Sequence, residues 1–223
     1  IIDLASRYSH EGADELVFYD ITASPDRRSV DRKWINLVAK EINIPFCVAG
    51  GIKTIADAEE VLNYGADKIS INTPALKNPD LIEQLAKRFG SQCIVLSIEA
   101  IKNNSSWEVL TDNGREKTGI DVIDWVKEAE KMGAGEILLT SVDSEGTQKG
   151  FDINLINEVN KNIDLPLIVA GGAGNIDHII DIKNKTKIDA VCCASIFHYN
   201  IYSPNELKIL LERNNINIRL EAI

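Results

Sequence analysis

Short apolar runs alternate with amphipathic stretches along the chain, and this pattern predicts strands and helices in turn. Most of the strand candidates are apolar nearly throughout, which is typical of parallel strands covered on both faces. The candidates are Leu16–Tyr19, Phe46–Ala49, Lys68–Ile71, Cys93–Ile98, Glu136–Thr140, Leu167–Val169 and Ala190–Ala194. The helix candidates between them include Arg32–Ile42, Ile55–Tyr64, Asp80–Phe89, Val122–Met132 and Asn154–Asn162. This alternation predicts βαβ units and an α/β fold.

Two further features refine this picture. Thr54 stands just before a helix candidate and is followed three residues later by Asp57, a spacing that predicts a helix start. The longest stretch without a clear pattern, Asn103–Thr118, is polar around Trp107–Leu110. We interpret it as an irregular excursion beyond the preceding strand.

The strongest internal evidence is a repeat. Ile44–Gly51 (IPFCVAGG) returns 121 positions later as Leu165–Gly172 (LPLIVAGG). The segment before the first strand candidate, Gly12–Leu16, returns at the same offset as Gly133–Ile137. Two similar halves of strand–helix units predict an eight-stranded (β/α) barrel, the TIM barrel, with a half-barrel internal repeat. An open doubly wound sheet is the alternative, but it does not require such a repeat.

The repeat also predicts an absence. The strand ending at Glu99 has no counterpart, because its equivalent would precede residue 1. We therefore expect one barrel domain over residues 1–223 that lacks its first strand and loop, and a longer natural protein. A barrel without one strand would expose sheet edges.

Composition and net charge limit the classes of molecule that the protein could bind. The chain has 223 residues, 44% of them hydrophobic, and a net charge of −10, which argues against a broad nucleic-acid or membrane surface. A phosphorylated small molecule stays possible, since backbone amides bind phosphate whatever the net charge. Neither a membrane span nor a targeting segment is visible. The four cysteines lie in apolar runs without zinc spacing, so we expect reduced core thiols in a cytoplasmic protein.

Active sites of such barrels lie at the carboxyl ends of the strands. The residues that the sequence places there are Asp20, Gly50-Gly51, Asn72-Thr73, Glu99, Thr140-Ser141, Gly171-Gly172 and Ala194-Ser195. Each glycine pair precedes a strand that ends in a small hydroxyl residue, Thr73 or Ser195. The pairs serve either tight strand–helix packing or phosphate binding. Two copies favour two phosphate sites, and hence a substrate phosphorylated at both ends.

Other polar residues allow two interpretations each. Glu99 is either a general acid or base or a salt-bridged rim residue. Asp20 either orients ligand hydroxyls or caps the following loop, and Asp143–Thr147 is either a ligand-contacting loop or a solvated turn. At the opposite ends of the strands, Glu15, Lys68 and Glu136 form either an ordinary solvated face or a charged ring. The three histidines form no metal constellation, and we expect neither a metal nor a cofactor.

These residues resemble the cyclase subunit of imidazole glycerol phosphate synthase, a family of histidine biosynthesis. The resemblance runs from the first residue to the Ile218–Leu220 tail. The segments that carry it are Gly12–Ser24, Ile44–Ile52, Gly65–Thr73, Phe89–Gln92, Gly133–Leu139, Gly171–Gly174 and Ala194–His198.

The resemblance implies an ammonia-dependent cyclase. Its substrate is a bis-phosphorylated aminoimidazole carboxamide ribonucleotide, and its products are imidazole glycerol phosphate and the ribonucleotide AICAR. A glutaminase subunit, docked on the opposite face in a heterodimer, supplies ammonia through the barrel interior, where Cys47 takes a lining position.

The resemblance also assigns roles residue by residue. The residues matching phosphate contacts are Gly51, Asn72, Thr73, Gly172, Ala194 and Ser195; further expected substrate-contacting residues are Asp20, Thr140, Glu145 and Gly146. Glu15, Lys68 and Glu136 match charged residues gating the ammonia channel, and Asp67 and Gln92 match the partner surface. Glu99 takes the place of one of two catalytic carboxylates.

Two substitutions depart from the family pattern. The family has aspartate where this chain has Glu99, and usually also where it has Glu145. The second catalytic aspartate matches a position outside this sequence. A carboxylate displaced by about 1 Å can cost about 100-fold in rate, so we expect the 223-residue fragment to be weak or inactive. Two rivals stay open: a diverged paralogue that supplies ammonia for sugar amidation, and a non-catalytic scaffold that activates a glutaminase.

Overall fold

The computed structural model describes residues 1–20 and 32–220, and within them the chain divides into two compact units. The first unit contains residues 1–96 and 132–135, and the second contains residues 97–131 and 136–223. The matching segment Ile21–Ser24 lies outside the described residues. Strand–helix alternation runs through both units and confirms the predicted (β/α)8 class of fold. The single domain over 1–223 stays a prediction.

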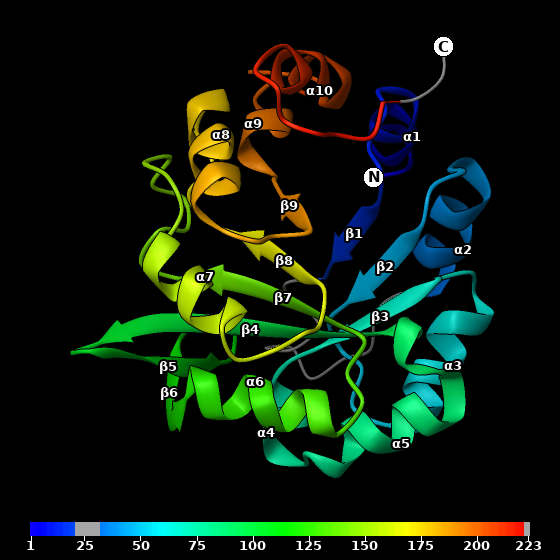
Figure 1. The fold of residues 1–223 in the computed structure, drawn as a ribbon. Coiled ribbons are helices and arrows are strands. Elements are labelled where there is room, and N and C mark those ends of the chain that lie inside the picture. The colour runs from blue at the N-terminus through cyan, green and yellow to red at the C-terminus, as the bar shows by residue number, and fades with distance from the viewer. Residues whose placement is uncertain (21–31, 221–223) are drawn as a thin grey trace. The chain divides into compact units, whose positions relative to one another are not determined.

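The first unit is a parallel sheet with helices. Its strands β1 (Leu16–Tyr19), β2 (Phe46–Ala49), β3 (Lys68–Ile71) and the start of β4 (Ile94–Asn103) pair in that order, all parallel. Figure 1 shows β1, β2 and β3 side by side, in blue to cyan. The other elements are α1 (Ile2–His10), α2 (Arg32–Glu41), α3 (Ile55–Asn63), α4 (Thr73–Lys77), α5 (Asp80–Phe89) and the short 3-10 turn η1 (Ser91–Cys93).

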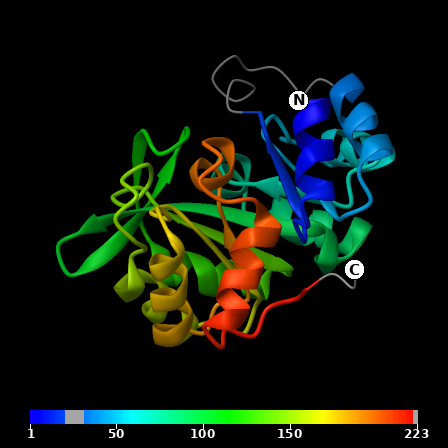
Figure 2. The ribbon, with the colours of Figure 1, turned by 90° about the horizontal axis from the view of Figure 1, so that it is seen from above.

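The second unit continues from β4. Strand β4 neighbours β7 (Glu136–Ser141), which is followed in the sheet by β8 (Leu167–Ala170) and β9 (Ala190–Cys192), with β7, β8 and β9 parallel. The helices of this unit are α6 (Val122–Lys131), α7 (Ile153–Asn160), α8 (Ile176–Lys185), α9 (Ser195–His198) and α10 (Pro204–Arg213). Helices α8 and α10 lie side by side and share an apolar cluster that includes Ile179 and Leu211 (Figures 1 and 2).

The stretch Asn103–Thr118 is not irregular, which corrects the sequence interpretation. Strand β4 runs on to Asn103 and pairs antiparallel with β5 (Ser106–Thr111), which pairs antiparallel with β6 (Glu116–Asp121). These green strands project beyond the helices of their unit (Figure 2). The apolar side of the hairpin is covered, because Trp107 and Val109 are buried. Residues with positive φ make both turns, Asn104 in one and Asp112 in the other.

Buried apolar residues on the strands form the core. All four residues of β2 are buried, as are the first five of β4, and β7 contributes Ile137, Leu138 and Leu139. Burial on both faces of a strand explains why these runs do not alternate between apolar and polar residues. The predicted helix start at Thr54 is also confirmed, since Thr54 and Asp57 form a reciprocal capping box at the start of α3.

The repeat extends to hydrogen bonds. In the first unit Leu16 donates its amide to the carbonyl of Pro45 at 2.9 Å, and 121 positions later Ile137 donates to Pro166 at 3.0 Å. The Asp67 carboxylate accepts the Phe46 amide at 2.8 Å, and Asp189 accepts the Leu167 amide at the same distance. The same bonds thus hold the start of an equivalent strand in each unit.

Candidate active site

The carboxyl ends of β1, β2 and β3 bring four of the predicted residues to one edge of the first unit. Asp20 follows β1, Gly51 follows β2, and Asn72 and Thr73 follow β3. All four are half-buried. Because these strands are parallel and hydrogen-bonded in sequence, their ends share one edge of the sheet.

Gly50 allows β1 and β2 to approach closely at this edge. Its φ is +103°, and a β-carbon there would stand 2.6 Å from the carbonyl oxygen of Asp20. The Asp20 amide in turn donates to the carbonyl of Ala49 at 3.0 Å. The repeat-related Gly171 has a φ of +90°, and its β-carbon would stand 2.9 Å from the carbonyl of Ser141. Close packing of strand ends and turns therefore requires glycine at Gly50 and Gly171, and also at Gly172, where a β-carbon would overlap the carbonyl oxygen of Gly150.

Two short helices, absent from the sequence prediction, follow the ends of β3 and β9. Helix α4 begins at Thr73, directly after Asn72, and α9 begins at Ser195, directly after Ala194. Neither residue before the helix places a side-chain cap on it. Five and four residues are too few to give a helical period, so the pattern could not reveal these helices. Their first residues are the hydroxyl-bearing Thr73 and Ser195.

In the second unit the turn after β7 meets the ends of β8 and β9. The Glu145 amide donates to the Ser141 carbonyl at 2.9 Å, and a β-carbon on Gly171 would stand 3.2 Å from the Glu145 carboxylate. Burial of the Cys193 thiol, together with nearby Cys192 and the negative charge of Glu145, raises the pKa of Cys193 to about 12. Glu145 therefore lies close to the end of β9, where α9 begins.

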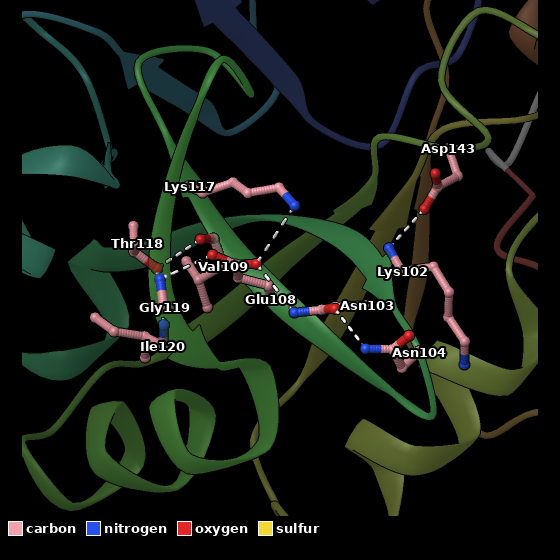
Figure 3. A network of polar contacts seen from close by, with 10 residues as sticks. All are labelled: Lys102, Asn103, Asn104, Glu108, Val109, Lys117, Thr118, Gly119, Ile120 and Asp143. Atoms are coloured by element: carbon pink, nitrogen blue, oxygen red, sulfur yellow. Dashed lines mark hydrogen bonds and ion pairs between the residues drawn. The ribbon is translucent and has the colours of Figure 1, made fainter.

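The remaining predicted residues of this edge occupy the same three strand ends. Thr140 lies within β7 and is half-buried, Gly146 is exposed in the turn beyond it, and Gly172 is buried after β8. In the same turn the Asp143 carboxylate accepts the Lys102 amide at 2.7 Å, which joins the turn to β4 (Figure 3). The turn is therefore held to the sheet by hydrogen bonds.

Glu99 lies inside β4 rather than at its end, which corrects the predicted strand boundary. It is half-buried and stands opposite Leu110 of β5. Its carboxylate accepts the backbone amide of Gly114, at the tip of the β5–β6 hairpin, at 2.9 Å. Sequence reasoning missed this partner because the hairpin itself was not predicted.

At the amino ends of the strands in the first unit, Glu15 and Lys68 form a two-pronged ion pair. The Lys68 ammonium lies 2.8 Å and 3.0 Å from the two carboxylate oxygens of Glu15, with both side chains partly buried. Asp67, the residue before Lys68, accepts the backbone amide of Phe46 at the start of β2 and therefore has a structural role as well as its predicted place on the partner surface. Gln92 is exposed in η1. In the second unit, Glu136 is the first residue of β7.

The histidines have local contacts. His10 bonds the Ser6 carbonyl at 2.7 Å, and His178 accepts the Gly174 amide at 3.1 Å. Within residues 1–20 and 32–220 no three His, Cys, Asp or Glu side chains are grouped to hold a metal ion. None of the helices in this described part has the length and apolar composition needed to span a bilayer.

Comparison with known proteins points to one family. The family described as "Histidine biosynthesis protein" matches residues 1–203. The similar proteins include "Imidazole glycerol phosphate synthase subunit HisF" from three bacteria. The Dehalococcoides mccartyi protein is 46% identical over 220 residues, 99% of this chain and 87% of that protein. The Francisella philomiragia protein is 48% identical over 99% of this chain and 87% of its own length. The Aliivibrio fischeri protein is 48% identical over 98% of this chain and 88% of its own length.

Proposed function

This chain belongs to the family of histidine biosynthesis proteins, and from that premise we propose that it is a cyclase of histidine biosynthesis. The family resemblance drawn from the sequence is confirmed. The protein uses ammonia to convert a bis-phosphorylated aminoimidazole carboxamide ribonucleotide into imidazole glycerol phosphate and AICAR. Ammonia adds to the ketose carbonyl of the substrate, water leaves, and ring closure with bond cleavage releases the two products.

The observation that carries this function is the duplicated corner at the strand ends. Each unit combines a glycine pair, Gly50-Gly51 or Gly171-Gly172, with a helix that begins at a small hydroxyl residue after the next strand. Helix starts and glycine corners present backbone amides, which bind phosphate. One phosphate is bound by Gly51, Asn72 and Thr73, and the other by Gly172, Ala194 and Ser195. Holding both phosphates orients the reacting centre of the substrate.

Proton transfer during ring closure is assigned to Glu99. Glu99 is half-buried, lies within strand β4, and its carboxylate has a defined hydrogen-bond partner. A carboxylate in such a setting can take and return protons as bonds form and break. Asp20, Thr140, Glu145 and Gly146 contact the rest of the substrate in this proposal.

The ammonia source is a glutaminase subunit. The protein forms a heterodimer with it, and Asp67 and Gln92 belong to the surface that meets this partner. The Glu15–Lys68 ion pair, with Glu136, controls the entry of ammonia, and Cys47 lines its path. The ion pair supports this role because it is only partly buried and so can open to a neutral molecule.

The working compartment is the cytoplasm. All four cysteines are thiols rather than disulfides within the described residues. Thiols persist in a reducing compartment. No nucleic acid, membrane, metal or cofactor takes part in the proposed reaction.

Steady-state kinetics with the natural full-length protein and ammonium as nitrogen source test the proposal. The Thr73→Val and Ser195→Ala variants each remove one proposed phosphate-binding hydroxyl. We expect each to raise KM by about 10-fold or more, because a hydrogen bond to a charged group is lost. Ser105→Ala, which changes an exposed hydroxyl in the turn between β4 and β5, is the matched control and should leave KM unchanged.

Two results would contradict the proposal. Stimulation of the glutaminase without any cyclisation would support a non-catalytic scaffold, and amidation of a sugar nucleotide in place of cyclisation would support a diverged paralogue. Unchanged KM values in both hydroxyl variants would leave cyclisation intact but refute the assigned phosphate sites.

A further inference from the structure

We propose that the tip of the β5–β6 hairpin is a positioning element for the reaction, in which the backbone amide of Gly114 holds the Glu99 carboxylate in place. This inference rests on the proposed function, because it assumes that Glu99 transfers protons. Gly114 contributes through its backbone amide, so the residue types in the sequence do not reveal its role.

The geometry requires the full length of a glutamate. Glu99 stands opposite Leu110 on the neighbouring strand, so its side chain reaches along the hairpin toward the tip. The Gly114 nitrogen lies 2.9 Å from the Glu99 Oε2 atom. An aspartate at this position would end about 1 Å earlier, beyond hydrogen-bonding distance of the amide. The glutamate and the hairpin tip therefore fit each other.

The tip has a defined shape that aims the Gly114 amide. Three consecutive residues, Asp112, Asn113 and Gly114, have φ values of 53°, 58° and 75°. The turn is closed by the Arg115 amide, which donates to the Thr111 carbonyl at 3.0 Å. Because left-handed conformations are seldom adopted by chance, this run specifies the direction in which the Gly114 amide points.

The hairpin behind the tip is held by a second carboxylate. Glu108, which is buried, accepts the Gly119 amide at 2.8 Å and the Asn103 side-chain amide at 3.2 Å, and lies 4.0 Å from the Lys117 ammonium (Figure 3). Thr118 adds a side-chain bond to the Val109 carbonyl at 2.6 Å. These contacts tie β5 to β6 and to the end of β4, so the tip does not swing freely relative to Glu99.

Position 114 also has little room for a side chain. A β-carbon on Gly114 would stand 3.3 Å from a methyl carbon of Val142, a contact closer than ordinary packing. Alanine there must push Val142 away or leave the left-handed conformation. Either movement turns or displaces the amide that Glu99 accepts.

The hairpin supplies a matched control at Gly119. Gly119 has a φ of +72°, close to that of Gly114, and its amide also donates to a carboxylate, that of Glu108. A β-carbon there would meet no atom within 4 Å. The Gly119→Ala variant therefore imposes a similar backbone strain in the same hairpin, leaves the bond from its amide to Glu108 in place, and does not touch Glu99.

The experiment compares Gly114→Ala with Gly119→Ala in the natural full-length protein, with ammonium as nitrogen source. We expect Gly114→Ala to lower kcat by about 10-fold or more, as for a hydrogen bond to a charged group. Its KM should stay within about twofold, because the phosphate-binding residues are unchanged. Gly119→Ala should keep both constants. A loss of kcat that is equal in the two variants would overturn the proposal.

A double-mutant cycle with Glu99→Asp separates positioning from general damage to the fold. The shorter carboxylate cannot reach the amide, so Gly114→Ala should cause no further loss of kcat in that background. Full additivity of the two changes would overturn the proposal. If the unmodified protein shows no cyclisation at all, the proposed function fails instead, which distinguishes the two failures.

Discussion

Substitution of Gly50 by alanine tests the close approach of β1 and β2 at the proposed phosphate site. At a φ of +103° an alanine is strained, at a cost of about 1–3 kcal/mol. The added β-carbon would also stand 2.6 Å from the Asp20 carbonyl, so the two strand ends must separate. Separation weakens the 3.0 Å bond from the Asp20 amide to Ala49, worth about 1 kcal/mol.

Together these effects lower the free energy of unfolding by about 3 kcal/mol. A domain of ordinary stability, about 5–15 kcal/mol, survives such a loss, so the variant should fold. With a urea dependence of about 3 kcal/mol per molar, the midpoint of urea unfolding should fall by about 1 M. Circular dichroism during urea titration measures this midpoint.

Gly119→Ala is again the control, because it has a left-handed φ but no atom within 4 Å of its β-carbon. It should lose only the backbone strain, about 1 kcal/mol. The loss in Gly50→Ala beyond that in Gly119→Ala therefore reports the contact with Asp20 together with the greater strain at a φ of +103°. Equal urea midpoints for Gly50→Ala and Gly119→Ala would show that the close approach of β1 and β2 contributes nothing to stability.

Three further predictions concern the remaining contacts. Asp152→Ala removes both the side-chain cap of α7 and the acceptor of the buried Trp107 indole N–H at 2.9 Å, so urea titration should show a free energy of unfolding lower by about 2 kcal/mol. Asp152→Asn should lower it less. Equal losses in the two variants would contradict the double role of Asp152. The hydrogen bond from the Ser203 amide holds the pKa of Glu206 below its usual value of 4.5, so the ionised carboxylate stabilises the fold above that pH and stops doing so as the pH falls below it. Glu206→Gln should therefore lower the melting temperature at pH 7 and match the parent protein near pH 3. A difference in melting temperature that is the same at both pH values would contradict this prediction. Because its pKa is raised to about 12, Cys193 should resist iodoacetamide at pH 8 in the native protein and react in urea, as peptide mass spectrometry would show. Rapid labelling of the native protein would contradict the raised pKa.

Much of the fold was predictable because its signals are local. Apolar runs such as Phe46–Ala49 are buried on both faces, and they mark strands without any knowledge of their neighbours. The Thr54–Asp57 spacing marks a helix start through bonds made within four residues. The repeat of Gly50-Gly51 as Gly171-Gly172 predicts equivalent corners, and the first glycine of each pair has a positive φ.

The candidate site was predictable only in part. Strand ends placed Asp20, Thr73 and Ser195 at the correct edges, since the carboxyl ends of parallel strands share an edge. The helices that begin at Thr73 and Ser195 are too short for a period to reveal. The proximity of Glu145 to Cys193 depends on how the turn after β7 folds toward the end of β9, and the spacing of residues along the chain does not specify this.

The order of strands and helices, the duplicated halves and the residues at most strand ends follow from the chain alone, because these depend on periodicity and on neighbours along the chain. Three features depend on contacts between distant parts of the chain: the hairpin at Asn103–Thr118, the bond from Phe46 to Asp67, and the bond from Gly114 to Glu99. The hairpin is a choice of strand partner, and each of the two bonds joins a backbone amide to a carboxylate at least 15 positions away along the chain. A backbone amide is the same in almost every residue, so the chain carries no residue-specific mark of where it will bond.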